Sequence, residues 1–174
     1  MNRMRITVVV AMLMGLVAVT GCEKKEKAAA IEKTEGLPNF ALLDPAGIKH
    51  TRDELLKGGL VMVVTAPTLS QGKAQKGWSA FLEKSKPKAS HLVFLEDEST
   101  SAFKGMAEKE MKKEYKVGDP IILLLDKEGS LRSKLGLEKG KTVVLVYDDD
   151  GKLLYSNKGN PSEAGAHTIW SKLK

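Results

Sequence analysis

A short polar loop follows the apolar run Leu60–Val64. Its polar side chains are hydroxyls, amides and one amine, contributed by Thr65, Thr68, Ser70, Gln71, Lys73 and Gln75. A serine or threonine hydroxyl becomes a nucleophile only beside a general base. No Cys, His, Asp, Glu or Arg lies between residues 65 and 77. The loop therefore predicts a polar surface without a catalytic group. The hydroxyls of Thr65 and Ser70 are expected to accept backbone N–H bonds at a helix start.

The other polar residues predict no metal, cofactor or nucleic-acid site. His50, His91 and His167 are not spaced as ligands on one helix or one strand. The run Asp148–Gly151 lacks the spaced ligands and the closing Glu of a calcium loop, so it is interpreted as a hairpin turn. The formal net charge is +6, but positive and negative side chains are interspersed. Without a basic stripe, nucleic-acid binding is disfavoured.

The first 22 residues have the pattern of a targeting segment. Arg3 and Arg5 precede the apolar stretch 6–19, and residues 19–22 read Val-Thr-Gly-Cys. This stretch is shorter than the ~20 apolar residues that span a bilayer, so a signal peptide is favoured over a membrane helix. The ending resembles the lipobox of bacterial lipoproteins. That resemblance implies cleavage before Cys22 and acylation of its thiol and its new amine; an uncleaved anchor with an incidental cysteine is the alternative.

This reading divides the chain into three parts: a signal peptide at residues 1–21, a lipidated tether at 22–36, and a folded domain at 37–174. Two or more acyl chains give stable membrane attachment, so the membrane is an expected partner through Cys22. The expected location is the cell envelope, on its periplasmic or extracellular side. Glu23 is not the Asp that resembles an inner-membrane retention signal, which favours the outer membrane if the cell has one. Acylation would also consume the only thiol in the chain.

The apolar pattern after the tether predicts a mixed α/β domain. Runs rich in β-branched and other apolar residues predict strands at 40–43, 48–50, 60–64, 91–95, 120–125, 142–147 and 152–155. Helical spacing predicts helices at about 51–57, 73–85, 103–115 and 131–137, and a C-terminal helix after Pro161. The last two strands are expected to form a hairpin. Strands that alternate with helices place helices on both faces of the sheet.

Four phrases, in chain order, resemble the thioredoxin fold in its peroxiredoxin and TlpA-type branch. They are Leu37–Gly47, similar to the opening P-x-F-x-L-x-D-x-x-G; Thr51–Gly58, similar to the short helix before the central strand; Leu124–Gly136, similar to the phrase L-x-D-x-x-G; and Lys141–Tyr155, similar to the closing hairpin. The resemblance runs from Leu37 to the C-terminus. It implies a mixed central sheet with helices on both faces, a closing β-hairpin and a C-terminal helix.

The catalytic part of that resemblance fails. In this branch the loop after the central strand carries a redox cysteine. Pro67 matches the family's proline, but the cysteine-equivalent positions hold Gln71 and Ala74. Residues 140–142 lack the family's cis-proline, and Lys141 is the nearest candidate for the arginine of peroxiredoxins. Thiol–disulfide exchange and peroxide reduction both need a thiolate, so the resemblance predicts a fold that has lost its redox activity.

The sequence therefore predicts a membrane-anchored, redox-inactive lipoprotein. Its expected role is non-catalytic: binding an envelope protein or peptide at the degenerate loop, from Thr65 to Ala74. Two enzymatic alternatives stay open. One is a peroxiredoxin-like oxidoreductase of the envelope. The other is non-thiol chemistry at Ser70, Gln71 or Lys141, with a base supplied from elsewhere in the chain, such as His50 or His91.

Overall fold

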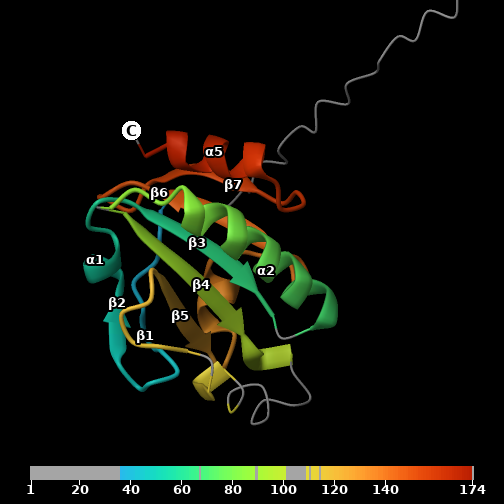
Figure 1. Ribbon diagram of the computed structural model, residues 1–174. Helices are drawn as coiled ribbons and strands as arrows, with labels where there is room; N and C mark the ends of the chain where they lie inside the picture. The colour runs from blue at the N-terminus through green and yellow to red at the C-terminus, as the bar shows by residue number, and fades with distance from the viewer. Residues whose placement is uncertain are drawn as a thin grey trace, which may run out of the picture.

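A single seven-stranded sheet forms the centre of the computed structural model (Figure 1). The structure describes residues 36–66, 68–88, 90–100, 109, 111–113 and 115–173, except the side chains of residues 69, 70 and 100. The strand order is β2-β1-β5-β4-β3-β6-β7. The strands are β1 Ala41–Leu43, β2 Lys49–Thr51, β3 Leu60–Thr65, β4 His91–Asp97, β5 Ile121–Asp126, β6 Val143–Tyr147 and β7 Leu153–Asn157.

The sheet is mixed, as the sequence predicts. Strand β3 pairs in parallel with β4, and β4 with β5, whereas β6 runs antiparallel to β3. Strands β6 and β7 form the predicted hairpin, and its turn is closed by hydrogen bonds between Asp148 and Lys152. Parallel strands need long crossovers, so the chain crosses the sheet between β3 and β4 through a helix. This arrangement brings the carboxyl ends of β3, β4 and β5 to one edge.

Helices cover both faces of the sheet. The helices are α1 Arg52–Leu55, α2 Leu69–Lys84, α4 Ser130–Lys134 and α5 Glu163–Ser171, and a 3₁₀ turn, η1, spans Glu98–Thr100. The predicted helix at 103–115 falls largely outside the described residues. Within that range, residues 109 and 111–113 are described as helical. No helix of the described part of the chain is long and apolar enough to cross a membrane.

Alternate residues of the central strands enter two separate cores. Met62 and Val64 of β3 pack with Leu55, Leu131 and other residues on the α1 and α4 side. Val61 and Val63 pack on the opposite face, with apolar side chains of α2 and α5. A strand buried on both faces has no polar alternation, which explains the continuous apolar run that marks β3 in the sequence.

Helices α2 and α5 lie over the same face of the sheet (Figure 1). Trp78 of α2 is 1% exposed, and a Cβ added at Gly165 of α5 would lie 3.1 Å from its ring. Trp170 Nε1 donates a 3.0 Å hydrogen bond to the Leu82 carbonyl near the end of α2. These contacts fix α2 against α5, and α2 begins at the loop that follows β3.

Helix α2 begins at Leu69, four residues before the predicted start at residue 73. The reason is the cap: Thr68 has an extended backbone, and its side chain accepts a hydrogen bond from the Gln71 N–H. A threonine N-cap satisfies one of the free amides of the first turn. The apolar spacing that sets the prediction begins only at Ala74, so the capped first turn carries no periodic signal.

Candidate functional site

The degenerate loop lies at the carboxyl end of β3, where the sequence places it. Thr65 is the last residue of β3 and Thr68 caps α2, while Gln71 and Ala74 lie within the first turns of α2. Lys141 is close by in the fold, because Val143 two residues later pairs with Val64. Pro67 and the Ser70 side chain lie outside the described parts of the structure.

The loop residues differ in exposure. Thr68 and Lys141 are exposed, and Ala74 is half-buried. Gln71 is only 4% exposed, and its Nε2 donates a 3.3 Å hydrogen bond to Thr68 Oγ1. Gln71, at a cysteine-equivalent position, therefore packs inward as part of the cap. The surface open to a partner consists of Thr68, Lys141 and the outer side of the first turn of α2.

A buried arginine lies beneath the loop. Arg132 of α4 is 1% exposed. Its guanidinium donates hydrogen bonds to the carbonyls of Thr65 (3.3 Å), Lys141 (2.7 Å) and Glu138. Burial lowers the pKa of Arg132, and the neighbouring carboxylates act in the opposite direction. The side chain thus joins the end of β3 to the segment before β6, and its charge faces backbone oxygens in the interior.

Carboxylates at the ends of β4 and β5 surround this arginine. Asp97 Oδ2 lies 3.5 Å from Arg132 Nε. Asp126 accepts hydrogen bonds of 2.9–3.0 Å from the N–H groups of Ser130, Leu131 and Arg132, which caps the first turn of α4. A buried charge is tolerated when it is paired and hydrogen-bonded. The ionic cluster of Arg132, Asp97 and Asp126 therefore fixes the floor of the loop.

The carboxylate nearest to β3 belongs to Glu96. Thr65 Oγ1 donates a 2.6 Å hydrogen bond to Glu96 Oε2. The prediction that this hydroxyl caps the helix start is therefore wrong, since Thr65 ends β3 and Thr68 is the cap of α2. Glu96 is 3% exposed, and burial raises its pKa, as do Glu98 and Asp97; Thr65 and Arg132 lower it. Thr65 is fully buried. The pair has the composition of a nucleophile and a base, but the threonine hydroxyl is closed to substrate, so this geometry does not support hydroxyl catalysis.

The loop sequence alone does not predict these charged residues as part of the site, because the loop contains no acid and no arginine. The available signal was the position of Glu96, Asp97 and Asp126 directly after the apolar stretches of their strands. In α/β sheets the residues after parallel strands meet at one edge, and Arg132 is the cation that this acidic edge requires.

Neither histidine reaches the loop, so the expected base from His50 or His91 is wrong. His91 pairs with Leu60, at the opposite end of β3 from Thr65. His50 lies on the edge strand β2 and contacts Asp44 at 3.4 Å. Strand β2 is four positions from β3, or about 19 Å at the usual strand spacing. Within the described residues, no group of three or more His, Cys, Asp or Glu is arranged to hold a metal ion.

Glu96→Gln is expected to raise the free energy of unfolding at neutral pH. The folded-state pKa of Glu96 is raised above its ordinary value of 4.5. At a pH between the ordinary pKa of the unfolded state and the raised pKa of the folded state, the folded state binds more protons than the unfolded state. The contribution of Glu96 to the free energy of unfolding therefore falls as pH rises. Glutamine does not titrate. Denaturant unfolding from pH 4 to 8 should give curves that converge at the acidic end and separate above it.

The exposed turn residue Glu128 supplies the matched control for this experiment. Glu128→Gln is expected to change the stability little at any pH, as is usual for surface substitutions. A Glu96→Gln protein that is less stable than the parent at pH 7 would show that the carboxylate is stabilising in the fold, contrary to the expected sign.

Solved structures with the same architecture identify the fold. A crystal structure assigned as the thiol:disulfide interchange protein DsbE from Chlorobium tepidum superposes with a TM-score of 0.64 at 19% identity, covering 83% of this chain and 100% of the other. The chain has the thioredoxin-like fold. The pneumococcal exposed lipoprotein thioredoxin Etrx1 from Streptococcus pneumoniae has a TM-score of 0.61 at 13% identity, covering 77% and 99%.

Peroxidoxin BcpB from Mycobacterium tuberculosis shares the thioredoxin-like fold with a TM-score of 0.54 at 21% identity, covering 79% of this chain and 93% of the other. The sequence itself matches no protein-family model and no curated protein. The resemblance drawn from the four phrases is therefore confirmed at the level of the fold. This chain has one cysteine, Cys22, which precedes the described residues.

Proposed function

We propose that this protein is a redox-inactive thioredoxin-like binding module of the cell envelope, anchored to the membrane through lipidated Cys22. The observation that carries the proposal is the content of the loop after β3. Its cysteine-equivalent positions hold Gln71 and Ala74, and residues 37–174 contain no cysteine. Redox chemistry of the kind named for the structural neighbours needs a thiolate. A binding role needs only the fold and the surface.

The degenerate loop is held in place in a way that suits binding. Arg132 ties the end of β3 to the carbonyl of Lys141, and the Thr68 cap fixes the first turn of α2. A surface that is already ordered loses little conformational entropy when a partner docks. The exposed side chains Lys73 and Lys141 favour a partner with acidic groups at the contact.

Affinity capture from native membranes tests the binding role. The full chain with a C-terminal tag is compared with a Lys73→Glu, Lys141→Glu variant, in which the charge of the loop surface is reversed. We expect recovery of the bound protein or peptide to fall about tenfold or more, as for the loss of an interface hot spot. The control is Lys49→Glu, Lys57→Glu, which makes the same charge change at exposed sites on the edge strand β2 and before the start of β3, at the end opposite the loop.

Two results would contradict the proposal. Equal recovery by the loop variant and its control would remove the loop as the binding surface. Consumption of peroxide or reduction of a disulfide by the Cys22→Ser protein, above the rate in buffer, would overturn the redox-inactive assignment, because that variant contains no thiol at all. Non-thiol chemistry at Ser70 stays a prediction from the sequence, since the side chain lies outside the described ones.

A further inference from the structure

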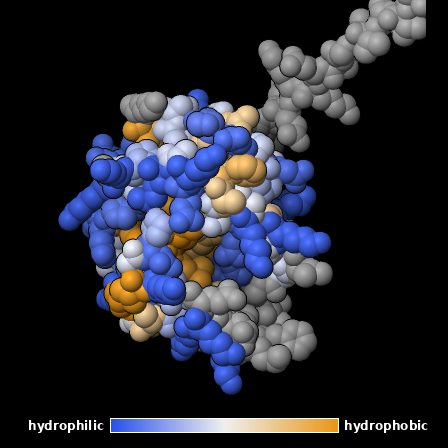
Figure 2. Space-filling model, viewed as in Figure 1, coloured by the Kyte–Doolittle hydropathy of each residue, from blue (hydrophilic) through white to orange (hydrophobic). Residues whose placement is uncertain are grey.

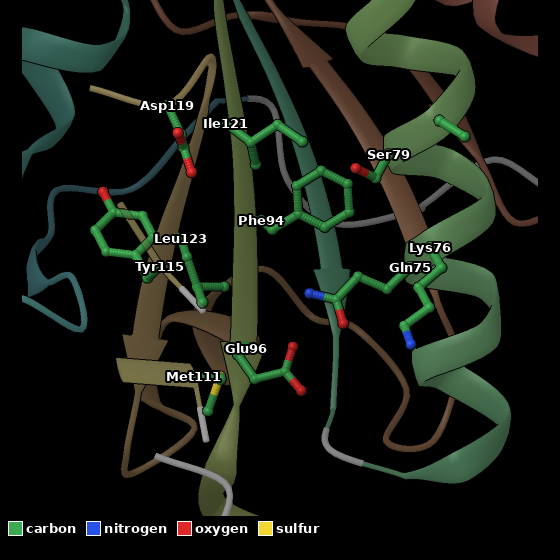
Figure 3. Close-up of a pocket in the computed structure, with 11 residues that line it drawn as sticks. Gln75, Lys76, Ser79, Phe94, Glu96, Met111, Tyr115, Asp119, Ile121 and Leu123 are labelled. Atoms are coloured by element: carbon green, nitrogen blue, oxygen red, sulfur yellow. The ribbon is translucent and has the colours of Figure 1, made fainter. Parts of the chain in front are cut away.

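A cavity of about 540 Å³ lies between α2 and the strands β4 and β5 (Figure 3). Its floor is apolar and is formed by Phe94, Ile121 and Leu123. Hydrophobic side chains are visible in a hollow over these strands in the surface view (Figure 2). Cavities that hold small ligands measure about 300–1,000 Å³ and combine apolar walls with a few placed polar groups. This cavity has that size and composition.

The charged groups that line the cavity among the described residues are two acids and one amine. Glu96 lines the cavity beside Gln75 of α2, and Asp119 lies at the other end of the floor, next to Ile121. In Figure 3 the Glu96 carboxylate and the Gln75 amide point toward one another across the space. The basic lining residue is Lys76, whose side chain is exposed. A flexible, solvated amine at the rim offsets little of the charge of a buried carboxylate.

Glu96 has free capacity to accept a hydrogen bond. Its carboxylate is 3% exposed and accepts one hydrogen bond among the described residues, from Thr65 to Oε2. An ionised carboxylate has about four acceptor sites, and a buried one needs them satisfied. The protein thus holds a partly satisfied carboxylate at the end of an apolar cavity, where a donor from a ligand would complete its hydrogen bonding.

We propose that this cavity binds a small organic cation, with an apolar body against Phe94, Ile121 and Leu123 and a protonated amine that donates to Glu96. A cation is favoured over an anion because the negative neighbours of Glu96, Asp97 and Glu98, outnumber its one cationic neighbour, Arg132. A ligand carboxylate would add a fourth negative charge. A bound cation would also oppose the effect of burial on the Glu96 pKa. The cavity adjoins the degenerate loop through the Thr65–Glu96 hydrogen bond, but it requires neither lipidation of Cys22 nor a partner on the loop surface, so this inference does not rest on the proposed function.

Ligand-observed ¹⁹F NMR tests the assignment with three probes that share one ring: 2-(4-fluorophenyl)ethylamine, 2-(4-fluorophenyl)ethanol and 3-(4-fluorophenyl)propionate. The full chain is used in lipid nanodiscs, and each probe is titrated against the parent protein and against Glu96→Gln. We expect the amine to bind about tenfold or more tightly than the propionate, and Glu96→Gln to weaken the amine by a similar factor, as for a hydrogen bond between charged groups. Binding of the alcohol should change little in this variant.

Two further variants locate the probe. Ala80 lines the cavity, so Ala80→Phe should fill it and weaken all three probes, whereas Lys134→Phe, at an exposed site on α4, should leave them unchanged. Tighter binding of the propionate than of the amine would overturn the cation assignment. Equal affinity of the parent and Glu96→Gln for the amine would exclude Glu96 as the group that binds it. Unchanged affinity of all three probes for Ala80→Phe would exclude the cavity as the binding site.

Discussion

Arg132→Met is expected to lower the free energy of unfolding by about 3–5 kcal/mol, the usual cost of removing one partner of a buried ion pair. Arg132 is 1% exposed and donates to the carbonyls of Thr65, Glu138 and Lys141. Methionine keeps much of the side-chain volume but leaves these carbonyls without their donor. It also leaves Asp97 without the cation 3.5 Å away. Urea unfolding of the full chain, followed by circular dichroism, measures the change.

The same loss is expected to lower the melting temperature by about 10–20 °C for a domain of this size. Lys134→Met is the control, since it makes a comparable exchange on the same helix at an exposed position and should cost less than about 0.5 kcal/mol. Adding Asp97→Asn to Arg132→Met should restore part of the stability, because the unpaired charge is removed. An Arg132→Met protein within 1 kcal/mol of the parent would show that the cluster does not hold the loop.

Trp78→Ala is expected to lower the free energy of unfolding by about 3–5 kcal/mol, as is usual for truncation of a buried aromatic residue. Trp78 is 1% exposed and packs in the core between the sheet and helices α2 and α5. Its ring lies so near Gly165 that a Cβ there would be only 3.1 Å away. Two helices that approach this closely have little freedom to collapse into the space that alanine would leave.

Trp78→Phe is the matched variant, and it should lose clearly less stability than Trp78→Ala because it keeps one ring in the core. Denaturant unfolding at one pH compares the three proteins. A loss of less than about 1 kcal/mol in the free energy of unfolding of Trp78→Ala would mean that α5 moves into the vacated space. Close packing against Trp78 would then not be the reason for a glycine at position 165. Since α2 also carries the degenerate loop at its start, binding at that loop is expected to weaken together with stability.

Much of the fold could be predicted from local sequence. The strands at 60–65, 91–97 and 143–147 contain the continuous apolar runs 60–64, 92–95 and 143–147, and burial on both faces of a sheet requires that composition. The closing hairpin was predicted from the Asp-rich turn at 148–151 between two apolar runs. These features depend on neighbours in the chain, so their order could be matched to the thioredoxin-like fold without knowledge of any long-range contact.

The loop after β3 shows where that reasoning stops. Its lack of cysteine is a property of the sequence, and so is the prediction that redox chemistry is absent. That Gln71 turns inward and that Thr68 begins the helix depend on a hydrogen bond that polar spacing does not encode. The early start of α2 is a cap effect, and a cap has no apolar period to detect.

The charged floor of the site was decided by the tertiary structure alone. Arg132 and Thr65 are 67 residues apart in the chain, and Glu96 and Thr65 are 31 apart, yet both pairs are hydrogen-bonded in the interior. Parallel pairing of β3, β4 and β5 brings their carboxyl ends together, and burial there makes each charge depend on its partners. The absence of cysteine from residues 37–174 follows from the sequence. Only the pairing of the strands brings the buried cation Arg132 and an acidic, apolar-floored cavity next to the loop that holds the cysteine-equivalent positions.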